Sequence, residues 1–371
     1  MPSPSSGASA ENTLPLVSVV IPAYRCAQYI AQAVESVLAQ SYPQREVIIV
    51  NDGSPDTPAL ELALRPYREK VCYITQPSRG PAAARNRGIL QARGEYVAFL
   101  DADDYWSPEH LAKQMELFFA DRTLELVYCD CVLLKDKPLT RAFSLQPQAP
   151  QVSFDALLVE SCAIGTSTTI VLRDTIVRAG LFDESFMRCE DFEMWLRMAF
   201  RGARMAYHPY AEVFHRVSEH GLSADRLAMK KDRLRVYEKL AATLALTGRQ
   251  RSVVERLAAE TRRDCDIDIL KHLLEAGEYQ NALVVAERAR SRSNSWKLRV
   301  TCTGLRIAPR LFGRLHRIRT RFVRDPYFQR ALARDEVDLS EESHSVALGF
   351  DSQVSPERLD REELERISSG T

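Results

Sequence analysis

Short apolar runs separated by helical patterns dominate residues 16–225. The apolar runs are VSVVIP (17–22), EVIIV (46–50), VCYIT (71–75) and YVAFL (96–100). Apolar positions from Ile30 to Leu38 recur at helical spacing, and a proline begins PAAARNRGILQA (81–92), as helix N-termini favour. Runs without alternation, each followed by a helix, predict parallel strands buried on both faces of a doubly wound α/β sheet.

Three further regions differ from this pattern. Residues 1–15 are small and polar, lack the basic start and apolar stretch of a signal peptide, and are expected to be disordered. Residues 226–334 have helical periodicity and become basic, and residues 335–371 carry 11 acids against three arginines. We therefore predict an α/β domain over 16–225, a helical region over 226–334 and a disordered acidic tail over 335–371.

Composition narrows the class of protein. The 371 residues are 45% hydrophobic and 27% charged, which is typical of a globular chain. Fifty basic and fifty acidic residues give no net charge, so a chain-wide surface for nucleic acid is not indicated. No apolar run approaches the ~18 residues of a membrane-spanning helix. Eight cysteines without a Cys-x-x-Cys pair indicate free thiols and a cytoplasmic location.

Polar clusters follow three of the predicted strands. They are Pro22-Ala23-Tyr24-Arg25, Asn51-Asp52-Gly53-Ser54 and Asp101-Ala102-Asp103-Asp104. Ligands of such sheets bind beyond the carboxyl ends of the strands, so we expect the three clusters to share one rim. Each cluster alone is also compatible with an ordinary turn.

Asp101 and Asp103 are the strongest chemical signal. Residues two apart on extended backbone point the same way, and two such carboxylates repel unless a cation lies between them. Oxygen ligands suit Mg²⁺ or Mn²⁺, although a solvated acidic turn is the alternative. Neither phosphate-binding glycine motif is present, which argues against a P-loop NTPase and a Rossmann dehydrogenase.

The second half adds two polar clusters. Glu190-Asp191 precedes a helical face that includes Trp195. Acidic residues at this position also have a structural explanation, because negative charge stabilises the start of a helix. A predicted strand at 203–208 leads to the turn-prone VFHRVSEHGLS (213–223), which contains His215, Arg216 and His220. The hydroxyls within 165–169 are interpreted as turn residues, with contact to a sugar as the alternative.

Four segments taken together resemble family 2 glycosyltransferases of the GT-A fold. They are VSVVIPAYR, VNDGSPD, RGPAAARNRGILQARGEYVAFLDADD and EDFEMWLRMAFRG, within residues 16–223. The resemblance implies a mainly parallel central sheet. It also implies transfer of a sugar, with inversion, from a nucleotide diphosphate sugar to an acceptor hydroxyl.

The resemblance also assigns roles to residues. Those expected at the nucleotide are Pro22, Ala23, Tyr24, Asp52, Arg85, Asn86 and Asp101. Asp52 would accept a hydrogen bond from the base, which suits UDP- or dTDP-linked donors. Asp103, with Asp101, would hold Mn²⁺ or Mg²⁺ on the diphosphate.

The remaining roles concern the second half. Asp191 would be the general base, while Glu190 and Trp195 would lie at the diphosphate or acceptor. Arg216 and His220 resemble a segment that closes over the diphosphate. The rival functions are a sugar nucleotidyltransferase, which would need a glycine-rich basic loop where PAYRCAQ stands, and a non-catalytic scaffold that binds nucleotide sugars.

The basic region suggests partners. Residues 296–334 contain 11 Lys or Arg and one acid, interleaved with apolar residues. This pattern fits a helix on anionic lipid at the inner face of the plasma membrane, next to a lipid-linked acceptor or glycan of surface polysaccharide synthesis. The alternatives are a basic face docked on the protein or neutralised by the tail, and a homodimer through the C-terminal helices.

Overall fold

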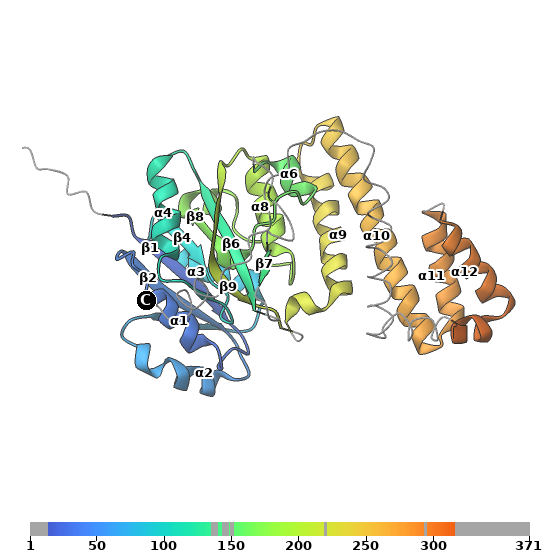
Figure 1. Ribbon diagram of the computed structural model, residues 1–371, viewed down its shortest axis with the longest axis horizontal. Helices are drawn as coiled ribbons and strands as arrows, with labels where there is room; N and C mark the ends of the chain where they lie inside the picture. The colour runs from blue at the N-terminus through green and yellow to red at the C-terminus, as the bar shows by residue number, and fades with distance from the viewer. Residues whose placement is uncertain are drawn as a thin grey trace, which may run out of the picture. The chain divides into compact units, whose positions relative to one another are not determined.

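The computed structural model describes residues 14–134, 140–142, 148, 152–218, 221–292 and 295–315. The chain divides between Ala224 and Asp225 into two compact units (Figure 1). The unit before this point contains the sheet, and the unit after it is helical in the part that is described. The predicted tails therefore lie outside the described residues, apart from Leu14 and Pro15.

Among the described residues, one mixed sheet joins all the strands, in the order β3-β2-β1-β4-β8-β6-β9-β5, with β7 beside β6. The strands are β1 Val17–Ala23, β2 Arg45–Asp52, β3 Cys72–Gln76, β4 Tyr96–Phe99, β5 Tyr105–Trp106, β6 Leu126–Leu134, β7 Thr140–Arg141, β8 Thr169–Leu172 and β9 Met205–Arg216. β1 to β4 pair in parallel, as the four apolar runs predict. β8 pairs antiparallel with both β4 and β6, whereas β6 and β9 are parallel.

Helices connect the strands of this unit. They are α1 Ile30–Leu38, α2 Thr57–Leu64, α3 Pro81–Gln91, α4 His110–Ala120, α6 Phe154–Leu158, α7 Arg173–Arg178 and α8 Glu190–Phe200, with the 3₁₀ turns η1 Arg65–Tyr67, η2 Thr166–Thr168 and η3 Leu222–Ala224. α1 and α3 match the helices predicted at 30–38 and 81–92. α3 lies close against β1. The approach requires a glycine at position 88, because a Cβ on Gly88 would come within 2.3 Å of Val20 Cγ1.

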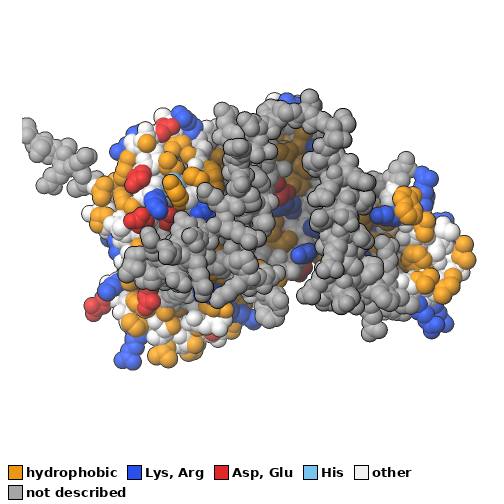
Figure 2. Space-filling model, viewed as in Figure 1, with side chains coloured by type: hydrophobic (Ala, Val, Ile, Leu, Met, Phe, Trp, Pro, Cys, Tyr) orange, Lys and Arg blue, Asp and Glu red, His pale blue; other side chains and the backbone are white. Residues whose placement is uncertain are grey.

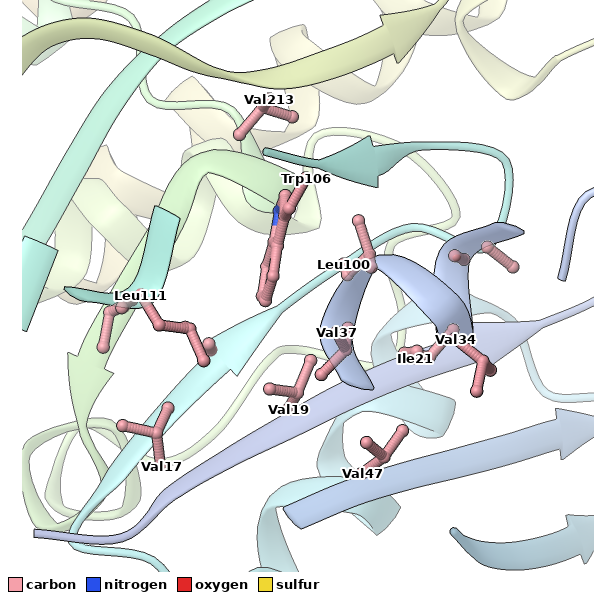
Figure 3. Packing of buried hydrophobic residues seen from close by; sticks show 14 of the residues in the cluster. Val17, Val19, Ile21, Val34, Val37, Val47, Leu100, Trp106, Leu111 and Val213 are labelled. Atoms are coloured by element: carbon pink, nitrogen blue, oxygen red, sulfur yellow. The ribbon is translucent and has the colours of Figure 1, made fainter. Parts of the chain in front are cut away.

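The core lies on both faces of the central strands. Val17, Val19 and Ile21 of β1 pack in one cluster with Val34 and Val37 of α1 (Figure 3). The opposite face of β1 carries Val20, which is covered by α3. β1 is thus buried on both sides, which explains why its sequence is a continuous apolar run.

The second half of β9 corrects the sequence-based prediction. Residues 213–223 were expected to form a turn after a strand at 203–208, but β9 continues to Arg216. Val213 and Phe214 are buried and pair with Trp106 and Tyr105 of β5, and the rings of Tyr105 and Phe214 stack at 4.6 Å. This packing outweighs the turn propensity of the polar residues around it.

The second unit contains α9 Arg226–Thr243, α10 Gly248–Ala276, α11 Tyr279–Ser291 and α12 Trp296–Ile307. α10 begins with a capping box between Thr247 and Gln250 and ends at Gly277, whose φ of 81° suits glycine. Buried apolar residues join α10, α11 and α12: Leu270, Leu274, Ala282, Val285, Ala286, Ala289, Leu298, Cys302 and Leu305. In the part of the chain that is described, no helix has the length and apolar character needed to cross a membrane.

Candidate active site

The segments after β1 and β2 meet at one edge of the sheet. Pro22 and Ala23 belong to the end of β1, and Tyr24 follows with 48% of its surface exposed. Arg25 has a left-handed backbone, with φ of 52°, and its N–H donates to Ser54 Oγ at 2.7 Å. The two strand ends are therefore tied together, and the Tyr24 ring stays open to a ligand.

Asp52 organises the loop before α3. Its carboxylate is buried and accepts hydrogen bonds from Gln76 Nε2 at 2.7 Å and from Ser78 Oγ at 3.2 Å. The backbone N–H groups of Arg79 and Gly80 also donate to it, at 2.9 and 2.8 Å. These donors occupy the four lone-pair directions of the carboxylate. A base could bond to Asp52 only by displacing one of them.

Arg85 links two motifs that lie far apart in the sequence. It is buried in α3, and its Nη2 donates to Asp101 Oδ1 at 2.6 Å while its Nη1 donates to Glu190 Oε1 at 2.5 Å. Burial alone would lower the pKa of Arg85, but the charges of Asp101 and Glu190 raise it overall. The acidic cluster after β4 and the start of α8 are thus held on one side chain.

Asn86 has a different position from the one expected at the nucleotide. It is buried, and its side chain donates to Phe182 O at 2.9 Å and to Glu184 Oε1 at 3.1 Å. Its Oδ1 accepts from the N–H of Phe182 at 2.9 Å. Asn86 therefore fixes the loop that leads into α8, rather than presenting its amide to the rim.

The three carboxylates after β4 have different surroundings. Asp101 is partly exposed and paired with Arg85. Asp104 is buried and accepts from Ser167 Oγ at 2.6 Å and from the N–H of Arg216 at 3.0 Å. Burial, followed by the charges of Asp101 and Asp104, raises the pKa of Asp103 to about 6. Asp103 thus carries the least compensated charge of the three.

His215 belongs to this cluster. Its Nδ1 lies 3.0 Å from Asp104 Oδ2, and 42% of its side chain is exposed. Burial would lower the pKa of His215, but the hydrogen bond and charge of Asp104, with the charges of Asp101 and Asp103, raise it to about 9. A positive imidazolium therefore stands beside the carboxylates at neutral pH.

Glu190 and Asp191 point to different partners at the start of α8. Glu190 is buried against Arg85, and burial, partly offset by Arg85, raises the pKa of Glu190 to about 7. Asp191 Oδ2 accepts from Thr166 Oγ1 at 2.9 Å, and Oδ1 accepts from the N–H of Phe192 at 2.7 Å. Cys189, just before them, has φ of 60°, which gives the sharp entry into the helix.

Trp195 is expected at the diphosphate or acceptor from the sequence. In the structure it is buried, with 1% of its surface exposed. Its ring packs against Phe99 of β4 at 6.4 Å and against Phe182 at 5.9 Å. The inward face of the amphipathic helix α8 takes it into the core, so it supports the site from behind.

Arg216 lies at the end of β9, next to the acidic cluster, and its side chain contacts α1 and β5. Its Nη2 donates to Gln32 Oε1 at 2.5 Å, and its guanidinium lies 4.9 Å from the ring of Tyr29 and 5.7 Å from that of Tyr105. These contacts hold the arginine against α1. His220, its predicted companion, lies outside the described residues.

The acidic cluster fits a divalent cation that also binds substrate. No group of three or more His, Cys, Asp or Glu among the described residues is arranged to hold a metal. Asp101 and Asp103 nevertheless offer oxygen ligands, and burial, followed by the charges of Asp101 and Asp104, raises the pKa of Asp103, which a bound cation would offset. Mg²⁺ is often held by one or two carboxylates together with phosphate oxygens, so two protein ligands are compatible with the predicted site.

Sequence reasoning did not find the contacts of Asp104, Thr166 and Ser167. Asp104 stood in the acidic run, and the two hydroxyls were interpreted as turn residues, with contact to a sugar as the alternative. Their partners lie 63 and 25 positions away, from Ser167 to Asp104 and from Thr166 to Asp191. The run of small hydroxyl residues directly before a strand was the available signal.

Comparison with known proteins identifies the family. Residues 18–174 match the model described as glycosyl transferase family 2. The UDP-Glc:alpha-D-GlcNAc-diphosphoundecaprenol beta-1,3-glucosyltransferase WfaP of Escherichia coli is 30% identical over 213 residues, which cover 57% of this chain and 81% of that protein. The chain belongs to glycosyl transferase family 2. By family it is a glycosyltransferase, as the resemblance implied.

Other relatives mark the extent of the match. An uncharacterized glycosyltransferase of Rickettsia typhi, RT0329, is 32% identical over 188 residues, and the matched part covers 49% of this chain. The chain spans 58% of the length of that relative. The helical unit from Asp225 onward lies beyond residues 18–174, which the family model matches.

Solved structures agree on the fold. Staphylococcus aureus TarS 1–349 in complex with UDP-GlcNAc superposes with a TM-score of 0.57 at 18% identity, covering 78% of this chain and 91% of that one. The mannosyltransferase PcManGT from Pyrobaculum calidifontis, in complex with GDP-Man and Mn²⁺, gives a TM-score of 0.54 at 18% identity, covering 85% and 89%. The fold is therefore GT-A, as predicted.

Proposed function

We propose that this chain is an inverting glycosyltransferase that moves a sugar from a UDP- or dTDP-linked donor to an acceptor hydroxyl. The observation that supports it most is the bridge made by Arg85. The bridge joins Asp101, beside the expected diphosphate site, to Glu190, which directly precedes the expected base Asp191. Donor and acceptor chemistry then share one rim of the sheet.

In this proposal Asp191 is the general base. Its carboxylate takes the proton of the acceptor hydroxyl as the oxygen attacks the anomeric carbon from the face opposite the diphosphate. A single displacement of this kind inverts the configuration. In the structure this carboxylate accepts a hydrogen bond from Thr166 Oγ1 at 2.9 Å.

The leaving diphosphate needs positive charge at the acidic cluster. Asp103 and Asp101 would hold Mn²⁺ or Mg²⁺, which supplies electrostatic stabilisation of the departing diphosphate when bound. His215 adds a second positive charge at neutral pH, because its pKa is raised to about 9. Asp104 keeps that imidazolium in place through its hydrogen bond to Nδ1.

The proposed donor rests on the name of one relative and on the residues at the rim of the sheet. The name of WfaP specifies UDP-Glc, so UDP-glucose is the first donor to test. Tyr24, exposed at the end of β1, is available to stack on a base. Base recognition by Asp52 requires one of its chain donors, such as Gln76, to move aside.

The acceptor proposal is a lipid-linked sugar or growing surface polysaccharide. The name of WfaP specifies a diphosphoundecaprenol-linked acceptor. On this chain, Trp296, Val300 and Ile307 are exposed and share one face of α12, at spacings of four and seven residues. Figure 2 shows hydrophobic and basic side chains together over α11 and α12. We propose that this face rests on anionic lipid.

The experiment that tests the function measures UDP or dTDP release. Full-length protein is incubated with UDP-glucose, UDP-galactose, UDP-N-acetylhexosamines and dTDP-rhamnose, with and without Mn²⁺, and with lipid-linked sugar acceptors. Release that depends on the acceptor and on Mn²⁺ supports the proposal. Pyrophosphate-dependent nucleoside triphosphate formation would indicate a nucleotidyltransferase, and binding without release from any donor would indicate a scaffold.

A further inference from the structure

The single turn η2 contacts both halves of the candidate site. Thr166 Oγ1 donates to Asp191 Oδ2 at 2.9 Å. The next residue, Ser167, donates from Oγ to Asp104 Oδ2 at 2.6 Å and accepts from the N–H of Asp101 at 3.0 Å. Two consecutive hydroxyls therefore reach the start of α8 and the acidic loop after β4.

The turn is anchored rather than free. Trp106 Nε1 donates to the carbonyl of Ser167 at 2.8 Å, and Gln114 Nε2 donates to that of Thr168 at 3.2 Å. Thr168 Oγ1 and Thr169 Oγ1 both donate to the carbonyl of Gly165, at 2.7 and 2.8 Å. All four hydroxyl residues are buried, at 6% exposure or less. A turn held from several sides can fix the position of what it contacts.

We propose that η2 is the positioning element that sets Asp191 relative to the acidic cluster, with Thr166 as the residue that orients the base. This inference rests on the proposed function, in which Asp191 is the base. The Thr166 hydroxyl donates to one carboxylate oxygen, so it limits rotation of the side chain. Ser167 bonds the same turn to Asp101 and Asp104. A shift of the turn would therefore change the position of Asp191 relative to the acidic cluster.

A merely structural role makes a different prediction. If Thr166 only packed the turn, its loss would lower the stability of the protein and leave kcat of the folded enzyme unchanged. If it orients Asp191, its loss would lower turnover with little change in donor binding, and serine at the same position would restore it. Thr175 on α7 provides the matched comparison, because its buried hydroxyl donates to Glu125 Oε1 at 2.8 Å, outside the candidate site.

The test uses full-length Thr166→Val, Thr166→Ser and Thr175→Val, assayed with the donor that gives the highest release in the panel above. We expect Thr166→Val to lower kcat by about tenfold or more, since misplacement of a reacting group is costly, while donor KM changes less than twofold. Thr166→Ser, which keeps the hydroxyl, and Thr175→Val should resemble the wild type.

Two results would overturn the inference. One is a wild-type kcat in Thr166→Val, and the other is an equal loss in Thr175→Val. Asp191→Asn separates this failure from failure of the proposed function. If Asp191→Asn is inactive and Thr166→Val is normal, only the positioning role fails. If Asp191→Asn is active, or no donor in the panel is turned over, both fail.

Discussion

Arg85 Nη2 donates a hydrogen bond of 2.6 Å to Asp101 Oδ1 from a position that is almost completely buried. The same guanidinium also pairs with Glu190, so its removal would leave buried carboxylate charge without a partner. This relationship makes Arg85 a residue on which both the stability of the unit and the geometry of the site depend.

We expect Arg85→Met to lower the free energy of unfolding by about 3–5 kcal/mol, because breaking a buried ion pair leaves an uncompensated charge. Urea denaturation measures the change. Arg79→Met is the matched control, since Arg79 and Glu184 form an exposed pair that should contribute less than about 1 kcal/mol. Arg85→Met/Glu190→Gln should recover part of the loss. A change in Arg85→Met no larger than that in Arg79→Met would contradict this.

Asp191→Asn should keep nucleotide binding and lose transfer. The amide has nearly the same shape, and its oxygen can still accept a hydrogen bond from Thr166, but it cannot take a proton. General base catalysis typically contributes 10²–10⁴-fold, so we expect a loss of about that size in kcat. UDP affinity, measured by calorimetry with Mn²⁺, should change less than about threefold, because binding does not use the base. Turnover near that of the wild type would reject Asp191 as the base.

Asp103→Asn should reduce the rise in melting temperature that Mn²⁺ with UDP produces. A ligand that binds only the folded state raises the melting temperature, so Mn²⁺ with UDP should stabilise the wild type. The variant loses the carboxylate whose charge is least compensated, and we expect its Mn²⁺ affinity to fall by at least about tenfold. Asp174→Asn, at an exposed i,i+4 pair on α7, is the control. Equal Mn²⁺ responses in the two variants would argue against this site.

Much of the fold could be predicted from the sequence, because β1 to β4 are buried on both faces and read as continuous apolar runs. The end of β9 could not, since His215 and Arg216 are polar and are held extended by pairing with Leu133 and Leu134 of β6. The acidic rim was predictable because strand ends cluster in parallel sheets. The inward position of Trp195 and the contact between Ser167 and Asp104 depend on tertiary packing, which local patterns do not contain.

His215 should make the free energy of unfolding decrease as the pH rises above neutral. Its pKa is about 9 in the folded protein, against an ordinary value of about 6.5. Its contribution is therefore fully present below pH 6.5 and is lost as the pH rises towards 9. With 42% of the side chain exposed, we expect an effect on the order of 1 kcal/mol.

Urea denaturation in EDTA at pH 6, 7.5 and 9 measures this contribution. The difference in unfolding free energy between wild type and His215→Gln should shrink steadily across the series. His272→Gln, at an exposed position on α10, should differ from the wild type by the same small amount at each pH. A constant difference for His215→Gln would remove the pairing with Asp104 as the cause.

The exposed face of α12 predicts binding to anionic membranes. Trp296 and Ile307 are 68% and 78% exposed, and residues 295–315 carry five basic and no acidic side chains. Both the apolar and the charged part should contribute, so full-length protein should sediment with vesicles containing phosphatidylglycerol more than with neutral vesicles, and less at high salt. Trp296→Ser/Ile307→Ser should reduce sedimentation several-fold. Val284→Ser, at an exposed apolar position on α11, should not.

The acidic tail gives the competing explanation for the basic residues. If residues 335–371 neutralise them within the chain, vesicle binding should be weak in the full-length protein, because the two charged segments already satisfy each other. Raising the salt concentration would then release the tail and increase binding through the apolar face, which is opposite to the fall expected for direct attraction to lipid. The sign of the salt dependence therefore separates direct attraction to lipid from neutralisation by the tail. Equal sedimentation of the wild type and of Trp296→Ser/Ile307→Ser would exclude the α12 face as the membrane contact under both explanations.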